Sequence, residues 1–223
     1  MNNRNYQREL DGILDRIPRG EKRLFLHSCC APCSSYVLEY LSAYFQVTVF
    51  YFNPNISPDG EYRHRLAEQK RLIERFNREG NRYPILVQEG EYEPRRFFDM
   101  ARGLEDCPEG GERCEKCFRL RLEETARQAL AAGADYFTTT LSISPLKNAP
   151  LLNCIGEELA RTYGIPWLPS DFKKKNGYKR SVELSAEYEL YRQDYCGCIY
   201  SKAERASRRD NREHRQNSSE ILN

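Results

Sequence analysis

Long apolar runs are missing from this sequence of 223 residues. No stretch approaches the roughly 20 consecutive apolar residues that a membrane-spanning helix needs. The first 22 residues are polar and charged, and they lack the apolar core of a signal peptide. Internal repeats are missing too, and the net charge is only +2. These absences argue against a membrane or secreted protein, so we expect a cytoplasmic protein with no membrane partner.

Cysteine, by contrast, is abundant, with nine residues in the chain. The cytoplasm keeps thiols reduced, so disulfide frameworks are rare there. Cysteines at short spacings in a cytoplasmic protein more often bind a metal or carry out redox chemistry. The sequence therefore predicts a metal site, a redox site or both.

The densest group of cysteines lies in the stretch from Leu24 to Tyr36. A short apolar run ends at His27, and Cys29, Cys30 and Cys33 follow before a segment with helical spacing. A helix N-terminus presents free N–H groups and partial positive charge, which lower the pKa of a nearby thiol. We therefore expect metal-binding or nucleophilic thiolates where a strand ends and a helix begins. A pair of packed apolar cysteines is the simpler alternative.

Strand-like and helix-like segments alternate along the chain, which predicts an α/β fold with a single doubly wound, Rossmann-like parallel sheet of about five strands. We expect an N-terminal helical segment at 1–22, a catalytic α/β domain at 23–201 and a disordered tail at 202–223. A helical extension at 185–191 is expected near the end of the domain. The five predicted strands are 23–27, 46–52, 83–88, 135–140 and 165–169.

In such a sheet, right-handed crossovers bring the loops after all strands to one edge. Those loops contain most of the unusual polar residues and cysteines. The sequence thus predicts one site at this edge, formed by Cys29, Cys30, Cys33, Asn53, Asn55, Cys114, Cys117, Ser142, Ser144 and Asp171.

Several kinds of chemistry fit the cysteine spacing. Cys30-Ala-Pro-Cys33 resembles a thioredoxin-type dithiol, but that leaves Cys29 and the Cys114-x-x-Cys117 pair unexplained. Two Cys-x-x-Cys pairs could form a four-cysteine zinc site, although their separation is far longer than usual. Four thiolates from two loops could also hold a [4Fe–4S] cluster.

Cys196-Gly-Cys198 is a different signal. Cysteines one residue apart can close only a small, strained disulfide, which is easily reduced and donates two electrons when it re-forms. A metal-binding tip or two packed thiols would be the alternative.

Seven motifs together resemble the QueH epoxyqueuosine reductases, cobalamin-independent enzymes that complete queuosine in tRNA. The motifs are H-S-C-C-A-P-C (27–33), F-N-P-N-I (52–56), E-Y-x-x-R (61–65), C-x-x-C-F-x-x-R-L (114–122), T-T-T-L-S-I-S-P-x-K-N (138–148), D-F-K-K-K-x-G-Y (171–178) and L-Y-R-Q-x-Y-C-G-C-x-Y-S (190–201). That family is similar in fold to the HUP nucleotide-binding proteins. The S-G-G-x-D-S phosphate loop of PP-loop ATPases is missing here, so we do not expect ATP use.

The resemblance implies a set of roles. Cys29, Cys30, Cys114 and Cys117 would ligate a [4Fe–4S] cluster, and Cys196 and Cys198 would form a catalytic, redox-active disulfide. His27 and Cys33 are the nearby candidates for ligands of an additional mononuclear iron. The implied reaction reduces the epoxide of epoxyqueuosine at the tRNA wobble position to the alkene of queuosine, with two electrons from an unidentified donor.

A tRNA substrate requires cations for phosphates and aromatic rings for splayed bases. The 173–180 segment, which we expect to be a basic loop, offers both. Two other classes of function remain open: a thioredoxin-like thiol-disulfide oxidoreductase and a zinc-stabilised RNA-binding module. The expected tRNA-binding residues are Lys173, Lys174, Lys175, Tyr178, Lys179 and Arg180.

Overall fold

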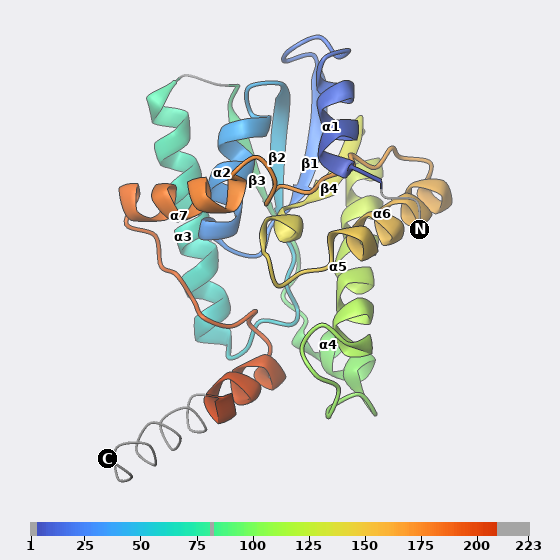
Figure 1. Cartoon of the computed structure of the whole chain (residues 1–223), viewed down its shortest axis with the longest axis vertical. Coiled ribbons are helices and arrows are strands. Elements are labelled where there is room, and N and C mark those ends of the chain that lie inside the picture. The colour runs from blue at the N-terminus through green and yellow to red at the C-terminus, as the bar shows by residue number, and fades with distance from the viewer. Residues whose placement is uncertain (1–3, 81–82, 209–223) are drawn as a thin grey trace, which may run out of the picture.

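The computed structural model describes residues 4–80 and 83–208 and places within them one parallel sheet (Figure 1). Its strands lie in the order β3-β2-β1-β4. β1 pairs with β2 on one side, where Leu24 lies opposite Val47, and with β4 on the other, where Leu24 lies opposite Tyr136. The strand bounds are Lys22–His27 (β1), Phe45–Tyr51 (β2), Ile85–Glu89 (β3) and Tyr136–Thr139 (β4).

Alternate residues of the central strand β1 pack into two separate hydrophobic cores, one on each face of the sheet. Leu24 and Leu26 pack into one apolar cluster with α1, α2, α3 and α7, whereas Phe25 packs into the other with α5 and α6. Successive side chains of a strand point to opposite faces, so a strand buried on both faces is apolar throughout. This explains why Leu24-Phe25-Leu26 is a continuous apolar run.

Local sequence signals mark where several helices begin and end. Pro32 occupies the first turn of α2, where a missing N–H costs nothing. The Asn148 side chain caps α6 by accepting a hydrogen bond from Leu151 N at 3.0 Å. Gly80 and Gly164 end α3 and α6 in the left-handed conformation that glycine favours. The helix bounds are Tyr6–Leu14 (α1), Ala31–Leu41 (α2), Asp59–Glu79 (α3), Pro94–Ala101 (α4), Glu112–Ala131 (α5), Ala149–Tyr163 (α6) and Gly177–Glu187 (α7).

The α/β class and the parallel sheet are confirmed, but the sheet has four strands within the described residues. The expected fifth strand at 165–169 meets the sheet only through a single bridge between Trp167 and Phe137. Two backbone hydrogen bonds join this segment to β4 in the described structure: Phe137 N donates to Pro166 O, and Leu168 N donates to Phe137 O. Pro166 has no N–H to donate, which limits the ladder that this segment can form.

Near the C-terminus the structure differs from two expectations. The helical extension begins at Gly177, eight residues before the expected 185, so residues 177–180 of the expected basic loop are helix. Residues 199–208 form a further helix, which runs seven residues into the expected disordered tail. The remainder of that tail, 209–223, lies outside the described residues. None of the helices described is long and apolar enough to cross a membrane.

The strand order reverses between β1 and β4, because the chain first adds β2 and β3 on one side of β1 and then β4 on the other. Ligands of open α/β sheets bind outside the carboxyl ends of strands at such a reversal. His27 at the end of β1 and Thr139 at the end of β4 lie side by side there.

Candidate active site and metal centre

The β1–α2 junction gathers three thiols at this crevice. The Sγ atoms of Cys29, Cys30 and Cys33 all lie within 4.8 Å of one another, and the Cys29 and Cys30 residues are almost fully buried. Cys30 is the extended residue that precedes α2. The thiols therefore surround a helix N-terminus, where backbone N–H groups favour thiolates. A soft metal prefers such a donor set.

The F-N-P-N-I motif explains how this junction keeps its shape. The Asn53 side chain donates a hydrogen bond to Ser28 O at 2.8 Å. Gln69 Oε1 on α3 accepts from the hydroxyls of Ser28 and Ser34, at 2.8 and 2.9 Å. These buried bonds attach both ends of the cysteine loop to β2 and α3, so the loop backbone has few alternatives.

His27 lies fully buried just before the thiols. Its Nδ1 and Thr139 Oγ1 are 2.8 Å apart, while Nε2 is buried without a hydrogen-bond partner among the described residues. Burial lowers the pKa of His27 to about 3, so the ring is neutral at physiological pH. A neutral imidazole held through one nitrogen, with the other unpartnered, is the usual arrangement of a metal-binding histidine.

Cys114 and Cys117 lie in the first turns of α5. Cys114 packs in the same core cluster as Cys29 and Cys30, and Gly110 N donates to its Sγ at 3.2 Å. Burial raises the pKa of Cys117 to about 11. Cys117 packs in another cluster with Cys198, and among the described residues neither Cys114 nor Cys117 joins the three sulfurs that lie within 4.8 Å of one another.

The buried guanidinium of Arg121 contacts residues beside both groups of cysteines. Its Nη1 donates to Asn53 Oδ1 at 3.4 Å and its Nε donates to Cys117 O at 3.3 Å. Burial lowers the pKa of Arg121, but the negative charge that Cys117 and Cys29 carry when ionised outweighs that effect, and the net direction is upward. Arg121 is thus placed to balance negative charge on a thiolate of either group.

The Cys196-Gly197-Cys198 loop forms the third part of the site. The two Sγ atoms are 3.7 Å apart, so both thiols are reduced and close enough to join with a small movement. Gly197 has φ +118°, and a Cβ there would lie 2.8 Å from Ile56 Cγ1, so only glycine fits. Ser57 N fixes the loop by donating to Gly197 O at 2.9 Å.

The E-Y-x-x-R motif holds the same loop from α3. Arg65 is 1% exposed, and its Nε donates to Glu61 Oε1 at 2.7 Å. Its Nη1 donates to Cys196 O at 3.3 Å, and the guanidinium lies 5.0 Å from the centre of the Tyr195 ring. A buried, paired arginine therefore ties the dithiol loop to the long helix α3.

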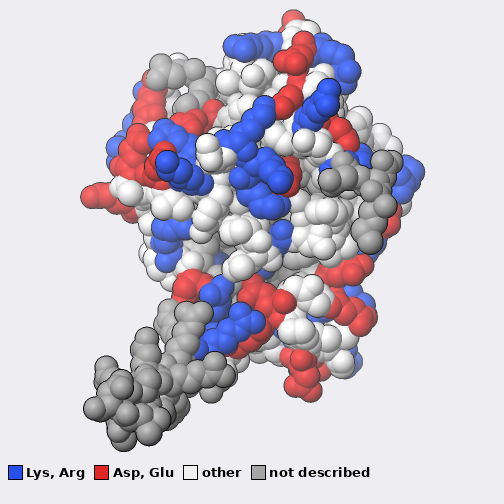
Figure 2. Space-filling view, viewed as in Figure 1, with Lys and Arg blue, Asp and Glu red and all other residues white. Residues whose placement is uncertain are grey.

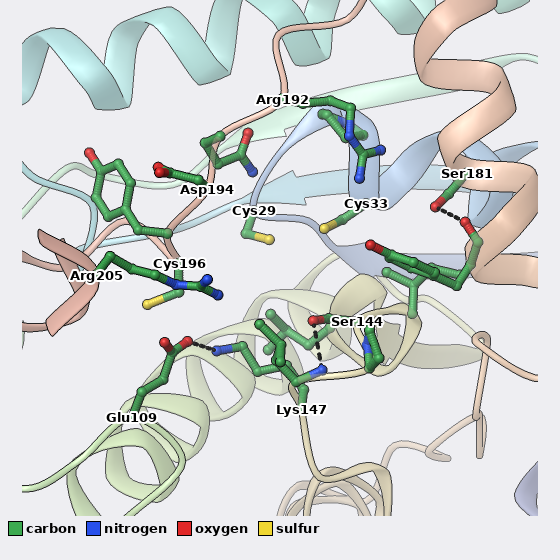
Figure 3. Close-up of a pocket in the computed structure, with 18 of the residues that line it drawn as sticks. Cys29, Cys33, Glu109, Ser144, Lys147, Ser181, Arg192, Asp194, Cys196 and Arg205 are labelled. Atoms are coloured by element: carbon green, nitrogen blue, oxygen red, sulfur yellow. Dashed lines mark hydrogen bonds and ion pairs between the residues drawn. The ribbon is translucent and has the colours of Figure 1, made fainter. Parts of the chain in front are cut away.

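A cavity of about 430 Å³ is lined by Cys29 and Cys33 of the β1–α2 junction and by Cys196 of the dithiol loop. Figure 3 shows side chains that line it. Cys29 and Cys33 project into the cavity from one side, and Cys196 lies near Arg205. The Lys147 side chain lies opposite Cys29 and Cys33 and extends toward Glu109. The residues that line it include Cys29, Pro32, Cys33, Glu109, Arg121, Leu141, Ile143, Ser144, Leu146, Lys147, Tyr178, Ser181, Arg192, Gln193, Asp194, Tyr195, Cys196 and Arg205.

The sequence of this chain is similar to proteins of one known family. Residues 24–204 match the family described as epoxyqueuosine reductase QueH. The chain belongs to the epoxyqueuosine reductase QueH family. It is 44% identical to the epoxyqueuosine reductase QueH of Staphylococcus epidermidis, with 88% of this chain and 84% of the relative covered. For the Streptococcus pyogenes protein of the same name the identity is 46% over 80% and 69%, and for that of Thermotoga maritima 37% over 82% and 91%.

All the cysteine motifs lie within the matched region of the QueH family. The thiols in each group differ sharply in acidity. Hydrogen bonds from Cys30 and Cys33 lower the pKa of Cys29, and the same interaction raises the pKa of Cys30 to about 12. Likewise, the hydrogen bond from Cys198 lowers the pKa of Cys196 and raises that of Cys198. Each group therefore contains one preferred thiolate.

Sequence reasoning did not single out Lys147, although it lies in the T-T-T-L-S-I-S-P-x-K-N motif. Its Nζ is 3.0 Å from Glu109 Oε1, and both side chains are only about a tenth exposed. Burial lowers the pKa of Lys147, but the negative charges of Cys196 and Glu109 raise it by more. The net pKa is raised, so the ammonium stays charged. A charged lysine embedded in a motif of small polar residues was the available signal.

The expected tRNA-binding segment is only partly a free basic surface. Lys173 forms an ion pair with Asp171, and Lys175 forms one with Asp11 at 2.6 Å. Arg180 pairs with Glu39 at 2.8 Å. Lys179 Nζ is 3.9 Å from a Glu183 carboxylate oxygen, and Lys174 has no ion-pair partner among the described residues. Tyr178 instead lines the cavity.

Proposed function

We propose that this protein is a tRNA epoxyqueuosine reductase, which reduces the epoxide at the wobble position to the alkene of queuosine. The observation that carries this proposal is one cavity lined by Cys29, Cys33 and Cys196, with the Cys198 Sγ only 3.7 Å from that of Cys196. A dithiol is a two-electron donor, and removal of an epoxide oxygen consumes two electrons. Membership of the family whose name describes this reaction supports the same conclusion.

The donor set fits an iron–sulfur cluster as well. We assign Cys29, Cys30, Cys114 and Cys117 to a [4Fe–4S] cluster, since such clusters are held by four thiolates. In support, Cys114 packs in one core cluster with Cys29 and Cys30, and Arg121 offsets negative charge from both cysteine pairs. When bound, the cluster would supply electron transfer and Lewis acidity at the cavity wall.

Two further side chains are assigned to an additional mononuclear iron. The Sγ atom of Cys33 lies within 4.8 Å of those of Cys29 and Cys30, and Cys33 lines the cavity. Because Cys33 is not assigned to the cluster, its thiol remains available for a second metal. His27 Nε2 is buried and unpartnered among the described residues, and its Nδ1 is fixed by Thr139. The structure offers one soft and one imidazole donor for this iron.

The dithiol supplies the two protons and two electrons that the reaction consumes. The thiols of Cys196 and Cys198 lose two protons and two electrons and become a disulfide; the two C–O bonds of the epoxide break, and its oxygen leaves as water. Cys196 lines the cavity and has the lowered pKa, whereas Cys198 is 4% exposed. Cys196 is therefore the thiol that meets substrate, and Cys198 closes the disulfide. An external electron donor must then reduce it.

The substrate would enter as an unpaired base of an anticodon loop. Tyr178 and Tyr195 line the cavity and offer rings on which a base can stack. Lys174, unpaired among the described residues, lies just before the helix that carries Tyr178 and is placed to contact phosphate.

Anaerobic purification tests the proposal directly. The protein should be brown, with about four sulfides and about five irons per chain, four of them in a cluster that Cys114→Ser removes. With a strong reductant, it should convert epoxyqueuosine in tRNA to queuosine, which nucleoside mass spectrometry detects. A colourless, zinc-containing protein that binds RNA would favour a structural module. Reduction of insulin disulfides without any action on tRNA would favour a thioredoxin-like enzyme.

A further inference from the structure

Two polar side chains in the cavity lack partners within the protein. Arg205 Nε and Gln193 Oε1 are buried, and neither makes a hydrogen bond among the described residues. Both residues line the cavity that contains Cys196, and Figure 3 shows the Arg205 side chain extending into it beside Cys196. Buried polar atoms without a partner cost free energy, so their retention in a cavity indicates a ligand that completes them.

Arg205 is not needed to attach its own helix to the protein. Helix 199–208 is held by Glu204, whose carboxylate accepts a hydrogen bond from Glu109 N at 2.9 Å. Tyr200 packs under the Arg113 guanidinium at 4.5 Å, and Ser201 N donates to Cys198 Sγ at 3.4 Å. The Arg205 guanidinium forms no ion pair with a carboxylate of the described residues. Its position is therefore imposed by the helix, and its donors remain available.

The chemistry of the pair points to a particular kind of ligand group. The Arg205 guanidinium can only donate, whereas the Gln193 amide presents an acceptor oxygen and a donor nitrogen on one carbon. A hydroxyl group both donates and accepts, so it satisfies either end of the amide and the arginine as well. A phosphate only accepts, so it leaves the buried Gln193 oxygen unpaired. The pair is complementary to hydroxyl groups rather than to the phosphate groups of RNA.

We propose that Arg205 and Gln193 form a subsite that hydrogen-bonds hydroxyl groups on the epoxide-bearing ring of the substrate and thereby aligns the epoxide with Cys196. The inference rests on the proposed function and adds to it the residues that select the modified base. Arg205 lies just beyond residues 24–204, the part that matches the family. It also lies in the segment whose sequence suggested a disordered tail.

The test compares binding with turnover in the purified, cluster-containing protein. Arg205→Met keeps the aliphatic stem and removes the donors, and Gln193→Met does the same for the amide. Arg208→Met is the matched control, since Arg208 is on the same helix, is 60% exposed and pairs only with Glu204 at 2.5 Å in the described structure. Each protein is assayed for kcat/KM and for affinity toward tRNA that carries epoxyqueuosine and the same tRNA with unmodified guanosine.

We expect Arg205→Met and Gln193→Met each to lower kcat/KM about tenfold or more, because a lost hydrogen bond leaves a buried partner unpaired. Their preference for modified over unmodified tRNA should fall by a similar factor, while affinity for unmodified tRNA and the cluster absorbance stay at wild-type values. Arg208→Met should match wild type throughout.

Three outcomes would overturn the inference. One is an unchanged preference for modified tRNA in both variants. A second is an equal loss of affinity for both tRNAs in Arg205→Met with a shallower salt dependence, which would make Arg205 a phosphate contact. The third is a wild-type protein that leaves the epoxide intact, which overturns the proposed function and this inference together; the first two leave the proposed function standing.

Discussion

The two thiols of the C-G-C loop are chemically unequal although they are separated by one residue. Cys196 faces the cavity and has a lowered pKa because of the hydrogen bond that it shares with Cys198, while Cys198 is buried and has a raised pKa. A thiolate attacks and a neighbouring thiol resolves, which is the division of labour in dithiol chemistry. The loop geometry is fixed by Arg65 and Gly197, which supports the proposed division of roles between the two thiols.

We predict that Cys196→Ala and Cys198→Ala each keep iron and tRNA binding but lose multiple turnover, because neither variant can form the disulfide. In the wild type, thiol labelling after a single turnover should find this pair oxidised, and added reductant should restore it. Loss of iron from either variant would show that the pair binds metal. Normal turnover in both would show that electrons reach the epoxide without the dithiol.

Lys147 is predicted to sustain the Cys196 thiolate. Its ammonium is buried with Glu109 and interacts with the charge on Cys196. Removing a positive charge raises the pKa of a neighbouring thiol, so Lys147→Met should slow iodoacetamide labelling of Cys196 at pH 7 and move the pH midpoint of labelling upward. Raising the pH should restore the wild-type rate, which a merely misfolded site would not allow.

The double variant Lys147→Met/Glu109→Gln is the control for an unpaired buried carboxylate. It should recover part of the labelling rate, since it removes the extra negative charge that the single variant leaves beside the thiol. Lys116→Met, on the exposed part of α5 where Lys116 pairs with Glu112, should label at the wild-type rate. An unshifted midpoint in Lys147→Met would contradict the role of this lysine.

At the scale of the element, a close approach between α6 and the segment that follows it, 165–170, supports the site. Gly156 lies in the interior of α6, and a Cβ there would lie 2.2 Å from the ring of Trp167. Trp167 Nε1 in turn donates to Asn153 Oδ1 at 3.0 Å. The same Asn153 oxygen accepts from Ser170 N at 3.0 Å, which ties the 165–170 segment to the helix.

Gly156→Ala should therefore destabilise the protein by about 1–3 kcal/mol, because the added methyl forces the tryptophan out of a packed core. Chemical denaturation followed by circular dichroism measures this. Gly12→Ala is the matched control: Gly12 is also helical, and a Cβ there meets nothing within 4 Å. Its expected effect is a gain of about 0.5–1 kcal/mol, since alanine favours helix. Equal stability of the two variants would contradict the packing argument.

On the scale of the whole molecule, the charge is mixed rather than concentrated. Figure 2 shows basic and acidic side chains side by side on the face that carries α7. Net charge is only +2, and most basic residues of the 173–180 segment have acidic partners. Binding to tRNA must therefore combine a few phosphate contacts with recognition inside the cavity.

Replacing Lys173, Lys174 and Lys175 together with alanine should weaken tRNA binding and make it less dependent on salt. Two of the three lysines already have carboxylate partners, so the slope of log affinity against log salt should fall by about one contact rather than three. Cluster absorbance should not change. Identical binding by the variant and the wild type at all salt concentrations would show that this segment takes no part in the interface.

The sequence by itself determined the α/β class, the strand end at which Cys29, Cys30 and Cys33 lie, and the family. These follow from local patterns: β-branched and aromatic runs mark strands, and cysteines clustered beside turn residues mark chemistry. The start of α7 was misplaced because the polar stretch K-R-S-V-E has weak apolar periodicity, while its helix is fixed by packing against α2 through residues such as Leu184. Weakly periodic segments take their structure from such contacts.

Only the tertiary structure decided which side chains share a cavity. Lys147, Glu109, Gln193 and Arg205 come from separate loops and a late helix, and no spacing rule links them. The structure also showed that several lysines of the basic segment are paired with acids far along the chain, such as Asp11. The physical reason is that burial and charge pairing depend on distances in space, which sheet topology sets by placing β1 between β2 and β4.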